Sequence, residues 1–337
     1  MSETAILGRS GLTVSRICLG TMTFGGRTDE AEAARIYGTA RDAGINFIDT
    51  ADVYNGGASE EITGRLIAGE RDRVILATKA ANPMGPDPNH RGLSRAWLMS
   101  GVDASLRRLG TDHIDVLYLH KEDHQTPLQE TVRAVEDLVR SGKVRHFGVS
   151  NHRTWRVAEI VRYADEANIT RPVVCQPYYH ALYRVIEVEL LPACRHFDMG
   201  VFCYSPLARG VLSGKYAGGV PSDSRAAQKD ARIMETEFRP ETIAAADRFV
   251  AQAKIRDVSP SAYAIAFALA NPLVTGAIAG PRTKEQLDAY LEALDYTWTA
   301  EDEAFAETVV PRGSTAVHHY FDPQYPLEGR PPRDATA

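Results

Sequence analysis

The segment NFIDTADVYN, residues 46 to 55, places two carboxylates and a phenol directly after a short apolar run. Phe47 and Ile48 are typical of a buried strand that ends in Asp49, and Tyr54 follows five residues later. A buried carboxylate costs several kcal/mol unless a cation pairs with it. The stretch therefore predicts a cationic partner for Asp49, with a tyrosine close enough to share its chemistry.

Two further ionisable residues, Lys79 and His120, end apolar runs later in the chain. If these runs are neighbouring parallel strands, their carboxyl ends meet at one mouth and Lys79 becomes the partner of Asp49. A protonated lysine stabilises a phenolate, so we expect the pKa of Tyr54 to lie below its usual value near 10. Tyr54 is then a general acid that protonates an oxygen during hydride delivery, and His120 orients that oxygen or assists the proton transfer.

Eight apolar, largely β-branched runs are expected to be the strands that carry these residues, at 16–19, 45–48, 74–78, 114–119, 144–149, 173–176, 200–203 and 274–278. Amphipathic segments between them predict helices at 30–43, 59–68, 95–109, 127–141, 154–167, 186–197, 240–255, 260–270 and 284–294. Alternation of strand and helix implies parallel pairing. Eight such units favour a closed (β/α)₈ barrel, the TIM barrel of the α/β class, over an open sheet.

The remaining segments predict a hairpin and two long loops within a single domain over residues 1–337. Residues 5–7 and 12–14 flank Gly8 and Gly11, which indicates an N-terminal β-hairpin. Residues 208–239 and the C-terminal tail, 311–337, lack periodicity, and long irregular segments in compact domains commonly serve function. We expect both at the face where the strands end, with the tail aromatics Tyr320, Phe321 and Tyr325 able to wall a pocket.

The charge balance and the lengths of the apolar runs indicate which kinds of partner the protein binds. Lys+Arg 38 against Asp+Glu 44 gives a net charge of -6 without a dense basic run, which disfavours nucleic acid and anionic membranes. No stretch approaches the roughly 18 apolar residues of a membrane span, and no secretory signal is apparent, so we expect a cytoplasmic protein. The four cysteines are scattered and predict small buried hydrophobes. A small molecule is the expected partner.

In order along the chain, the motifs LGRSGLTVSRICLGTMTFG, FIDTADVYNGGASEEITGRL, VILATKA, LGTDHIDVLYLHKED, LVRSGKVRHFGVSNH, QPYYH, YSPLARGVLSGKY and IAGPRTKEQL resemble those of the aldo-keto reductases. Members of this family are nicotinamide-dependent (β/α)₈ oxidoreductases. The resemblance implies a catalytic tetrad of Asp49, Tyr54, Lys79 and His120. It also implies reduction of an aldehyde or ketone carbonyl, or the reverse oxidation of an alcohol.

The resemblance also implies the cofactor contacts. Thr21, Met22 and Asp49 would lie near the cofactor, Ser150, Asn151 and Gln176 would hold the nicotinamide carboxamide, and Tyr204 would stack on its ring. Ser205, Pro206, Leu207, Ala208, Arg209 and Lys215 would cradle the pyrophosphate, so residues 208–239 become a cofactor-clamping loop. Arg225, Gly280, Arg282 and Gln286 would contact the adenosine end. There the chain departs from relatives that carry Glu-Asn, because it has Ala289 and Tyr290.

The charges at the adenosine end favour NADP(H) over NAD(H). Arg225 and Arg282 can meet a 2′-phosphate with charge-assisted hydrogen bonds, and Lys284 lies close in sequence. A Rossmann site is disfavoured because no G-x-G-x-x-G follows the first strand.

Three other functions are less consistent with the sequence. The stretch from Gly210 to Tyr216 has the wrong glycine spacing for a P-loop and lacks its Ser/Thr. The segment HKEDH, residues 120–124, has metal-binding residue types but not zinc-protease spacing, so no metal is expected, and His318 with His319 is read as a solvated pair. A cofactor-sensing regulatory protein of the same fold is the alternative, since some barrels of this kind are channel β subunits. Those carry asparagine in place of His120, so the histidine favours an enzyme.

Overall fold

The structure, a computed structural model, describes residues 3–222, 224–317 and 322–325. Eight strands form a closed barrel with parallel neighbours throughout, and the last strand pairs with the first. The strands are β3 (Ile17–Gly20), β4 (Phe47–Asp49), β5 (Ile75–Ala80), β6 (Ile114–Leu119), β7 (Val144–Ser150), β8 (Val174–Gln176), β9 (Gly200–Cys203) and β10 (Gly276–Ala279). The predicted (β/α)₈ barrel is confirmed, and each strand end lies within two residues of its predicted position.

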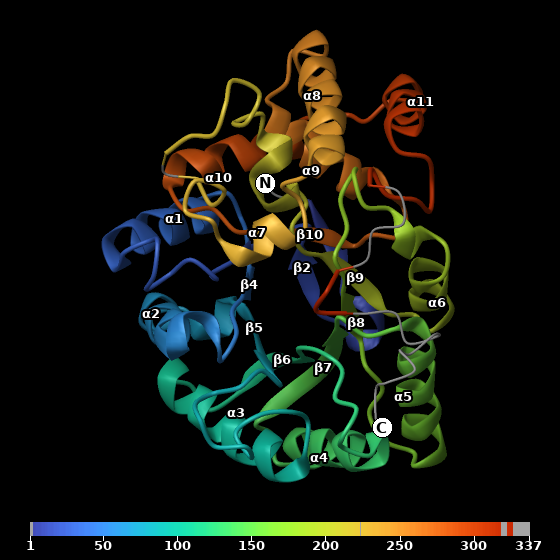
Figure 1. Cartoon of the computed structure of the whole chain (residues 1–337). Helices are drawn as coiled ribbons and strands as arrows, with labels where there is room; N and C mark the ends of the chain where they lie inside the picture. The colour runs from blue at the N-terminus through green and yellow to red at the C-terminus, as the bar shows by residue number, and fades with distance from the viewer. Residues whose placement is uncertain (1–2, 223, 318–321, 326–337) are drawn as a thin grey trace.

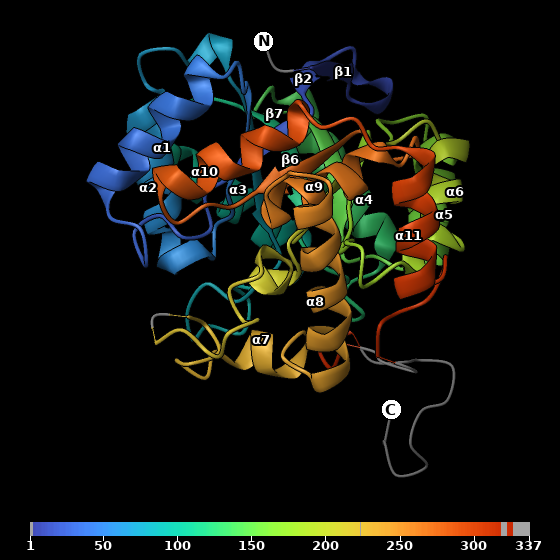
Figure 2. The same cartoon turned by 90° about the horizontal axis from the view of Figure 1, so that it is seen from above.

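Most of the helices surround the barrel on its outside (Figure 1). In chain order, the helices are α1 (Glu30–Asp42), α2 (Ala58–Ile67), α3 (Arg95–Leu109), α4 (Leu128–Arg140), α5 (Thr154–Glu166), α6 (Leu190–His196), α7 (Ala231–Glu235), α8 (Pro240–Ile255), α9 (Pro260–Ala270), α10 (Lys284–Leu291) and α11 (Ala300–Val309). Of these, α7 lies beyond one end of the barrel (Figure 2). Local sequence sets several of the ends. The hydroxyls of Ser94 and Ser259 accept the backbone N–H of the third residue after them, which caps α3 and α9.

The helix predictions were wrong in three places. The predicted helix at 186–197 is a 3₁₀ turn, η4 (Val185–Glu187), followed by the shorter α6. Neither α7 nor α11 was predicted. The sequence carried a signal for α11, because Thr299 and Asp302 form a reciprocal capping box at its start.

The predicted hairpin is confirmed and closes the end of the barrel where the strands begin. Strands β1 (Thr4–Ile6) and β2 (Thr13–Ser15) pair antiparallel, and Figure 2 shows them at the opposite end of the molecule from α7. Leu7 and Val14 join the core inside the barrel. Gly8 has a φ of 50°, and a Cβ there would lie 2.1 Å from the carbonyl oxygen of Val173. Only glycine allows this close approach.

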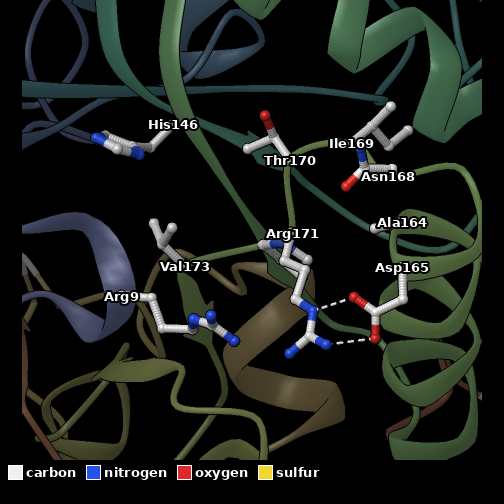
Figure 3. A pocket seen from close by; sticks show the side chains of 10 residues that line it. Arg9, His146, Ala164, Asp165, Asn168, Ile169, Thr170, Arg171 and Val173 are labelled. Carbon is white, nitrogen blue, oxygen red and sulfur yellow. Dashed lines mark hydrogen bonds and ion pairs between the residues drawn. The ribbon is translucent and has the colours of Figure 1, made fainter.

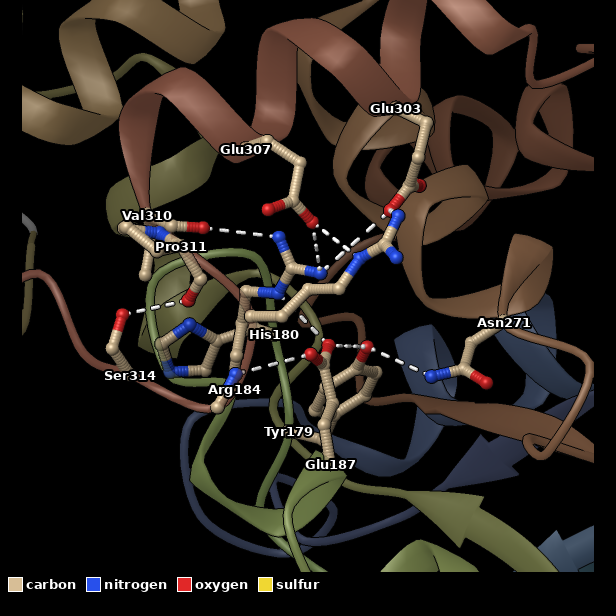
Figure 4. Close-up of polar contacts among 12 residues, drawn as sticks. Tyr179, His180, Arg184, Glu187, Asn271, Glu303, Glu307, Val310, Pro311 and Ser314 are labelled. Atoms are coloured by element: carbon tan, nitrogen blue, oxygen red, sulfur yellow. Dashed lines mark hydrogen bonds and ion pairs between the residues drawn. The ribbon is translucent and has the colours of Figure 1, made fainter.

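A buried arginine ties α11 to the loop after β8 (Figure 4). Arg184 donates to Glu187 at 2.8 Å, to the carbonyl oxygen of Val310 at 3.0 Å and to Glu307 at 3.2 Å. Its charge is therefore fully compensated within the protein. Among the described residues no helix has both the length and the apolar character needed to cross a membrane.

Candidate active site

The end of β4 and the end of β5 meet in a buried ion pair. The Lys79 ammonium lies 2.5 Å from Oδ2 of Asp49. It also donates to the carbonyl oxygen of Thr50 at 2.8 Å and to the Tyr54 hydroxyl at 3.1 Å, so each of its three N–H groups has an acceptor. Gln176, at the end of β8, donates to the other Asp49 oxygen at 2.9 Å. Asp49 thus has the predicted partner and a second donor beside it.

Charge compensation keeps Lys79 protonated. Burial alone would lower the pKa of Lys79, but the Asp49 carboxylate and the Tyr54 phenol outweigh that effect and raise the pKa above its usual value. The ammonium therefore stays charged at neutral pH and donates a hydrogen bond to the phenol oxygen. This leaves the phenol's own O–H group free to donate elsewhere.

The expected direction of the Tyr54 pKa was wrong. Burial raises the pKa of this phenol above its ordinary value, and the opposing influence of Lys79 is the smaller of the two. Lys79 also lies 4.7 Å from the centre of the Tyr54 ring. Spacing along the chain predicted the cation beside the phenol. The depth of burial decides whether the pKa of Tyr54 rises or falls.

A short 3₁₀ turn, η2 (Tyr54–Gly57), presents Tyr54 to the site. Asn55 has a φ of 51°, a left-handed conformation that asparagine tolerates better than most residues. Its side chain donates to the carbonyl oxygens of Met22 at 2.9 Å and Phe24 at 2.7 Å. These two bonds fasten the turn to the segment after β3 and so fix where Tyr54 lies.

His120 follows β6 and is neutral. Burial lowers its pKa well below the ordinary value, and the charges of Lys79 and Lys121 lower it further. The side-chain amide nitrogen of Asn82 lies 3.0 Å from His120 Nδ1. Because an amide nitrogen only donates, Nδ1 is the acceptor and the ring proton sits on Nε2. The imidazole is therefore a hydrogen-bond donor through Nε2, edge-on to the Tyr54 ring at a centroid distance of 6.0 Å.

These groups lie at the base of a cavity of about 1140 Å³ at the carboxyl ends of the strands. The cavity is lined by Tyr54 and His120 of the predicted tetrad, and by Met22, Asp49, Ser150, Asn151, Gln176, Tyr204, Ser205, Pro206, Leu207, Arg209, Lys215, Arg225, Gly280, Arg282 and Gln286 of the predicted cofactor contacts. Lys79, Thr21 and Ala208 are buried behind the wall. The Thr21 hydroxyl contacts the Asp49 carbonyl oxygen at 3.2 Å and Ser59 at 2.8 Å, so it supports the site from outside.

A hydrogen-bonded row joins the ends of β7, β8 and β9 along one wall. Tyr204 donates to Oδ1 of Asn151 at 2.7 Å, and the Asn151 amide donates to the carbonyl oxygen of His120 at 2.9 Å. Ser150 donates to the carbonyl oxygen of Gln176 at 2.8 Å. The row fixes the rotamers of the residues expected to hold a carboxamide.

The segment after β9 adopts backbone conformations suited to an anion. Ser205, Ala208 and Arg209 have φ values of 57°, 47° and 53°, and Gly210 has 95°. Left-handed residues among right-handed ones turn successive N–H groups toward one side, which creates concave anion-binding surfaces. Three non-glycine residues in this region mark a strained segment of the kind concentrated at ligand sites.

Arginines gather at the far part of the cavity. Burial lowers the pKa of Arg209, and its Nε is buried without a hydrogen-bond acceptor among the described residues. Burial also lowers the pKa of Arg225, and the charges of Arg209, Arg27 and Arg282 lower it further. Such a cluster of like charges is relieved by an anionic ligand.

The loop of residues 208–239 meets the C-terminal tail over the cavity. Arg232 on α7 donates to both carboxylate oxygens of Asp322, at 3.0 and 2.5 Å. Asp322 in turn accepts the backbone N–H of Gln324 at 2.9 Å, and Tyr325 lines the cavity. Of the three tail aromatics, Tyr325 reaches the cavity, while Tyr320 and Phe321 lie outside the described residues, as do His318 and His319.

A model of the aldo/keto reductase family matches residues 16–308. The chain belongs to the aldo/keto reductase family. It is 39% identical over 311 residues to an uncharacterized oxidoreductase, YrpG, of Bacillus subtilis, which covers 89% of this chain and 93% of that protein. It is 38% identical over 299 residues to a probable voltage-gated potassium channel subunit beta of Arabidopsis thaliana, covering 86% of this chain and 90% of that one.

Some residues lining the cavity of this aldo/keto reductase were not predicted as site residues, among them Arg27, Asn82, Lys121 and Arg232. Asn82 follows the end of β5 by two residues and Lys121 follows the end of β6 by two, so position at a strand end was the available signal. Ala289 and Tyr290, at the positions where the resemblance implied Glu-Asn, both line the cavity on α10. The Tyr290 ring is mostly buried there, and burial raises its pKa to about 12.

A second cavity of about 440 Å³ lies at the opposite end of the barrel in this aldo/keto reductase (Figure 3). It is lined by Arg9, His146 and the segment before β8, and Arg171 in its wall is paired with both oxygens of Asp165. No group of three or more potential metal-ligating side chains occurs in the part of the chain that the structure describes.

Proposed function

We propose that this protein is an NADP(H)-dependent oxidoreductase that reduces the carbonyl of an aldehyde or ketone, or oxidises the corresponding alcohol, with Tyr54 as the general acid. One observation carries the proposal. The Tyr54 phenol accepts a hydrogen bond from the buried, charge-compensated Lys79, and it lies beside a neutral His120 at the base of a large cavity.

The residues of the cavity fit a phosphorylated dinucleotide. The left-handed segment Ser205 to Gly210 offers backbone N–H groups, and the buried Arg209 has a nitrogen without an acceptor among the described residues. Asn151, Ser150 and Gln176 form a polar wall next to Tyr204, suited to an amide-bearing aromatic ring. A nicotinamide bound against this wall would supply the hydride.

The protein's own groups would manage the proton and the substrate oxygen. His120 donates through Nε2 and orients the carbonyl oxygen between itself and the Tyr54 hydroxyl. Tyr54 then gives its proton to that oxygen as negative charge develops there. Lys79 stabilises the resulting phenolate without moving, because Asp49 and the Thr50 carbonyl oxygen already hold it in place.

We assign NADP(H) in preference to NAD(H) on the same grounds. The cationic cluster of Arg27, Arg209, Arg225 and Arg282 exceeds the charge of a pyrophosphate alone. A 2′-phosphate brings close to two more negative charges and suits bidentate arginine contacts. In this proposal, residues 208–239 form a cofactor clamp, which Arg232 and Asp322 hold against the tail.

The test is a steady-state assay of NADPH oxidation with a panel of aldehydes, sugars and cyclic ketones. We expect multiple turnovers that do not require added metal. Activity abolished by EDTA and restored by zinc, or absence of turnover with every carbonyl, would contradict the proposal.

A cofactor-sensing regulatory protein is the second candidate, because relatives in Arabidopsis thaliana and in rice are named probable voltage-gated potassium channel subunits beta. This candidate predicts tight binding of NADPH with at most one slow oxidation per site. Pre-loading the protein with NADPH and adding a reactive aldehyde separates the two. An enzyme continues past the first turnover.

A further inference from the structure

A lysine borders the proposed reaction centre without taking part in its hydrogen bonds. Lys121 directly follows His120, is half-buried and lines the cavity. Its charge is close enough to help lower the pKa of His120. Lys121 therefore shares both the cavity and the electrostatic environment of His120.

The carboxylates nearest to Lys121 in sequence are committed to other groups. Glu122 is paired with Arg153 and His124. Asp123 accepts the backbone N–H groups of Leu93 and Gln125 and the Thr126 hydroxyl. Among the residues that the structure describes, none forms an ion pair with Lys121.

The carboxylates of the cavity wall are committed as well. Only Asp49 and Glu285 line the described cavity as acids. Asp49 is held by Lys79 and Gln176, and Glu285 lies on α10 at the adenosine end, 3.4 Å from Arg35. A half-buried ammonium without a carboxylate partner keeps much of its attraction for an incoming anion.

The other cations of the cavity differ from Lys121. Arg27, Arg209, Lys215, Arg225 and Arg282 lie on the side assigned to the dinucleotide phosphates. Arg232 is neutralised by Asp322 and Glu235. Lys121 is thus the cation on the substrate side whose charge no described residue compensates.

We propose that the substrate is a short-chain carbonyl compound carrying an anionic group, a carboxylate or a phosphate, and that Lys121 binds this group. The inference rests on the proposed function and names the substrate class of the same site. Because Lys121 adjoins His120, the anion and the carbonyl carbon are separated by only a few bonds. Val53 and Pro83, next in sequence to Tyr54 and Asn82, also line the cavity and can contact the intervening carbons.

The experiment compares substrates matched in length but not in charge. The carboxylate arm pairs 4-oxobutanoate with butanal, and the phosphate arm pairs glyceraldehyde 3-phosphate with glyceraldehyde. For the wild type we expect kcat/KM to favour the charged member of at least one pair by about tenfold or more. The arm with the larger preference identifies the anion.

Lys121→Met should reduce that preference by about 10- to 100-fold, chiefly through KM of the charged substrate. Lys121→Arg should preserve it. Lys254→Met, on the exposed surface of α8, changes the net charge equally and should leave it unaltered. Any influence of Lys121 on His120 cancels in the ratio, because both members of a pair use the same histidine.

The assignment of Lys121 would be overturned if the wild type favoured neither charged substrate, or if the ratio were unchanged in Lys121→Met. Reduction of butanal in the same assay would leave the proposed function intact. If no carbonyl is turned over, the proposed function fails, and calorimetric titration of 4-oxobutanoate and of glyceraldehyde 3-phosphate into the NADP⁺-loaded protein still tests the lysine. Binding that is equal in wild type and Lys121→Met, or absent in both, would then refute it.

Discussion

Lys79 and Arg184 are two buried cations that meet the same physical requirement in different ways. Each is almost fully removed from water and each contacts at least one carboxylate. Arg184 donates hydrogen bonds to Glu187, Glu307 and a backbone carbonyl oxygen, which all lie where α11 contacts the loop after β8 (Figure 4). Lys79 directs one N–H to Tyr54, a phenol that lines a cavity.

The two buried charges therefore differ in role: Arg184 holds parts of the fold together, whereas Lys79 acts on the proposed proton donor. Both would be costly to leave unpaired. Of the two cations, only Lys79 donates a hydrogen bond to a group that has a transferable proton and lines the cavity. Substitution of Lys79 should therefore lower both the reaction rate and the stability, whereas substitution of Arg184 should lower the stability and leave the rate nearly unchanged.

The largest effect on rate is expected for Tyr54→Phe. Removal of the hydroxyl deletes the proposed proton donor but leaves the ion pair of Asp49 and Lys79 in place. We expect kcat for carbonyl reduction to fall by about 10² to 10⁴, with cofactor affinity and Tm nearly unchanged. Retention of more than about a tenth of the wild-type kcat would remove Tyr54 from this role.

The pair Lys79→Met and Arg184→Met tests the comparison directly. Lys79→Met strands the Asp49 carboxylate in the core, so we expect a loss of about 3 to 5 kcal/mol in the free energy of unfolding together with loss of activity. Arg184→Met should lower stability on the order of 2 kcal/mol, because Glu303 and Glu307 are about one-third exposed and water can solvate them.

The two variants are each other's control in denaturant unfolding and in kcat per folded molecule. Arg184→Met should retain kcat within about twofold, since Arg184 is not among the residues lining the cavity. Equal losses of kcat in both variants would show that the two cations do not differ in function.

A smaller effect is expected at the adenosine end. Arg282→Ala should weaken NADPH binding by about tenfold and leave NADH binding nearly unchanged, because one charge-assisted contact to the 2′-phosphate is lost. Arg162→Ala on α5, whose guanidinium pairs with Glu159 and Glu166, is a matched control for charge. Parallel losses for both cofactors, or equal wild-type affinities, would refute the preference for NADP(H).

The smallest expected effect concerns Asp52, a buried carboxyl near the ion pair. Burial raises its pKa to about 7, and the Glu60 charge adds to this. As the pH rises through 7, the new negative charge raises the pKa of Tyr54 and makes it a weaker acid. We expect kcat/KM to fall about two- to threefold across this step. A pH profile of Asp52→Asn should lack the step, and its persistence there would assign it to another group.

Strand ends carried most of the predictive information, because parallel strands bring their carboxyl ends to one face. Asp49, Lys79 and His120 were placed correctly on that ground. Asn82 and Lys121 also lie two residues after strand ends, but they were not predicted as site residues because spacing does not show which of these side chains line the cavity. The sign of the Tyr54 pKa depended on burial, which a one-dimensional pattern does not give.

Helix prediction failed where hydrophobic periodicity was short or masked. Helix α7 has only five residues, and α11 begins with three acidic residues, Glu301, Asp302 and Glu303. Polar capping, rather than an apolar stripe, marks its start. The contact between Arg232 and Asp322 joins two segments predicted as irregular, and such pairings follow from the path of the chain in space.

The barrel closes through pairing of β10 with β3, so it cannot close until the last strand has been synthesised. Ala277 pairs with Ile17, near the other end of the chain. A ribosome releases the early strands first, so β3 keeps one open edge through most of synthesis. Until Ala279 emerges, the nascent sheet has two edges of unpaired N–H and C=O groups, which recruit strands from other chains. The yield of closed barrel therefore depends on how fast closure competes with such association, and not on equilibrium stability alone.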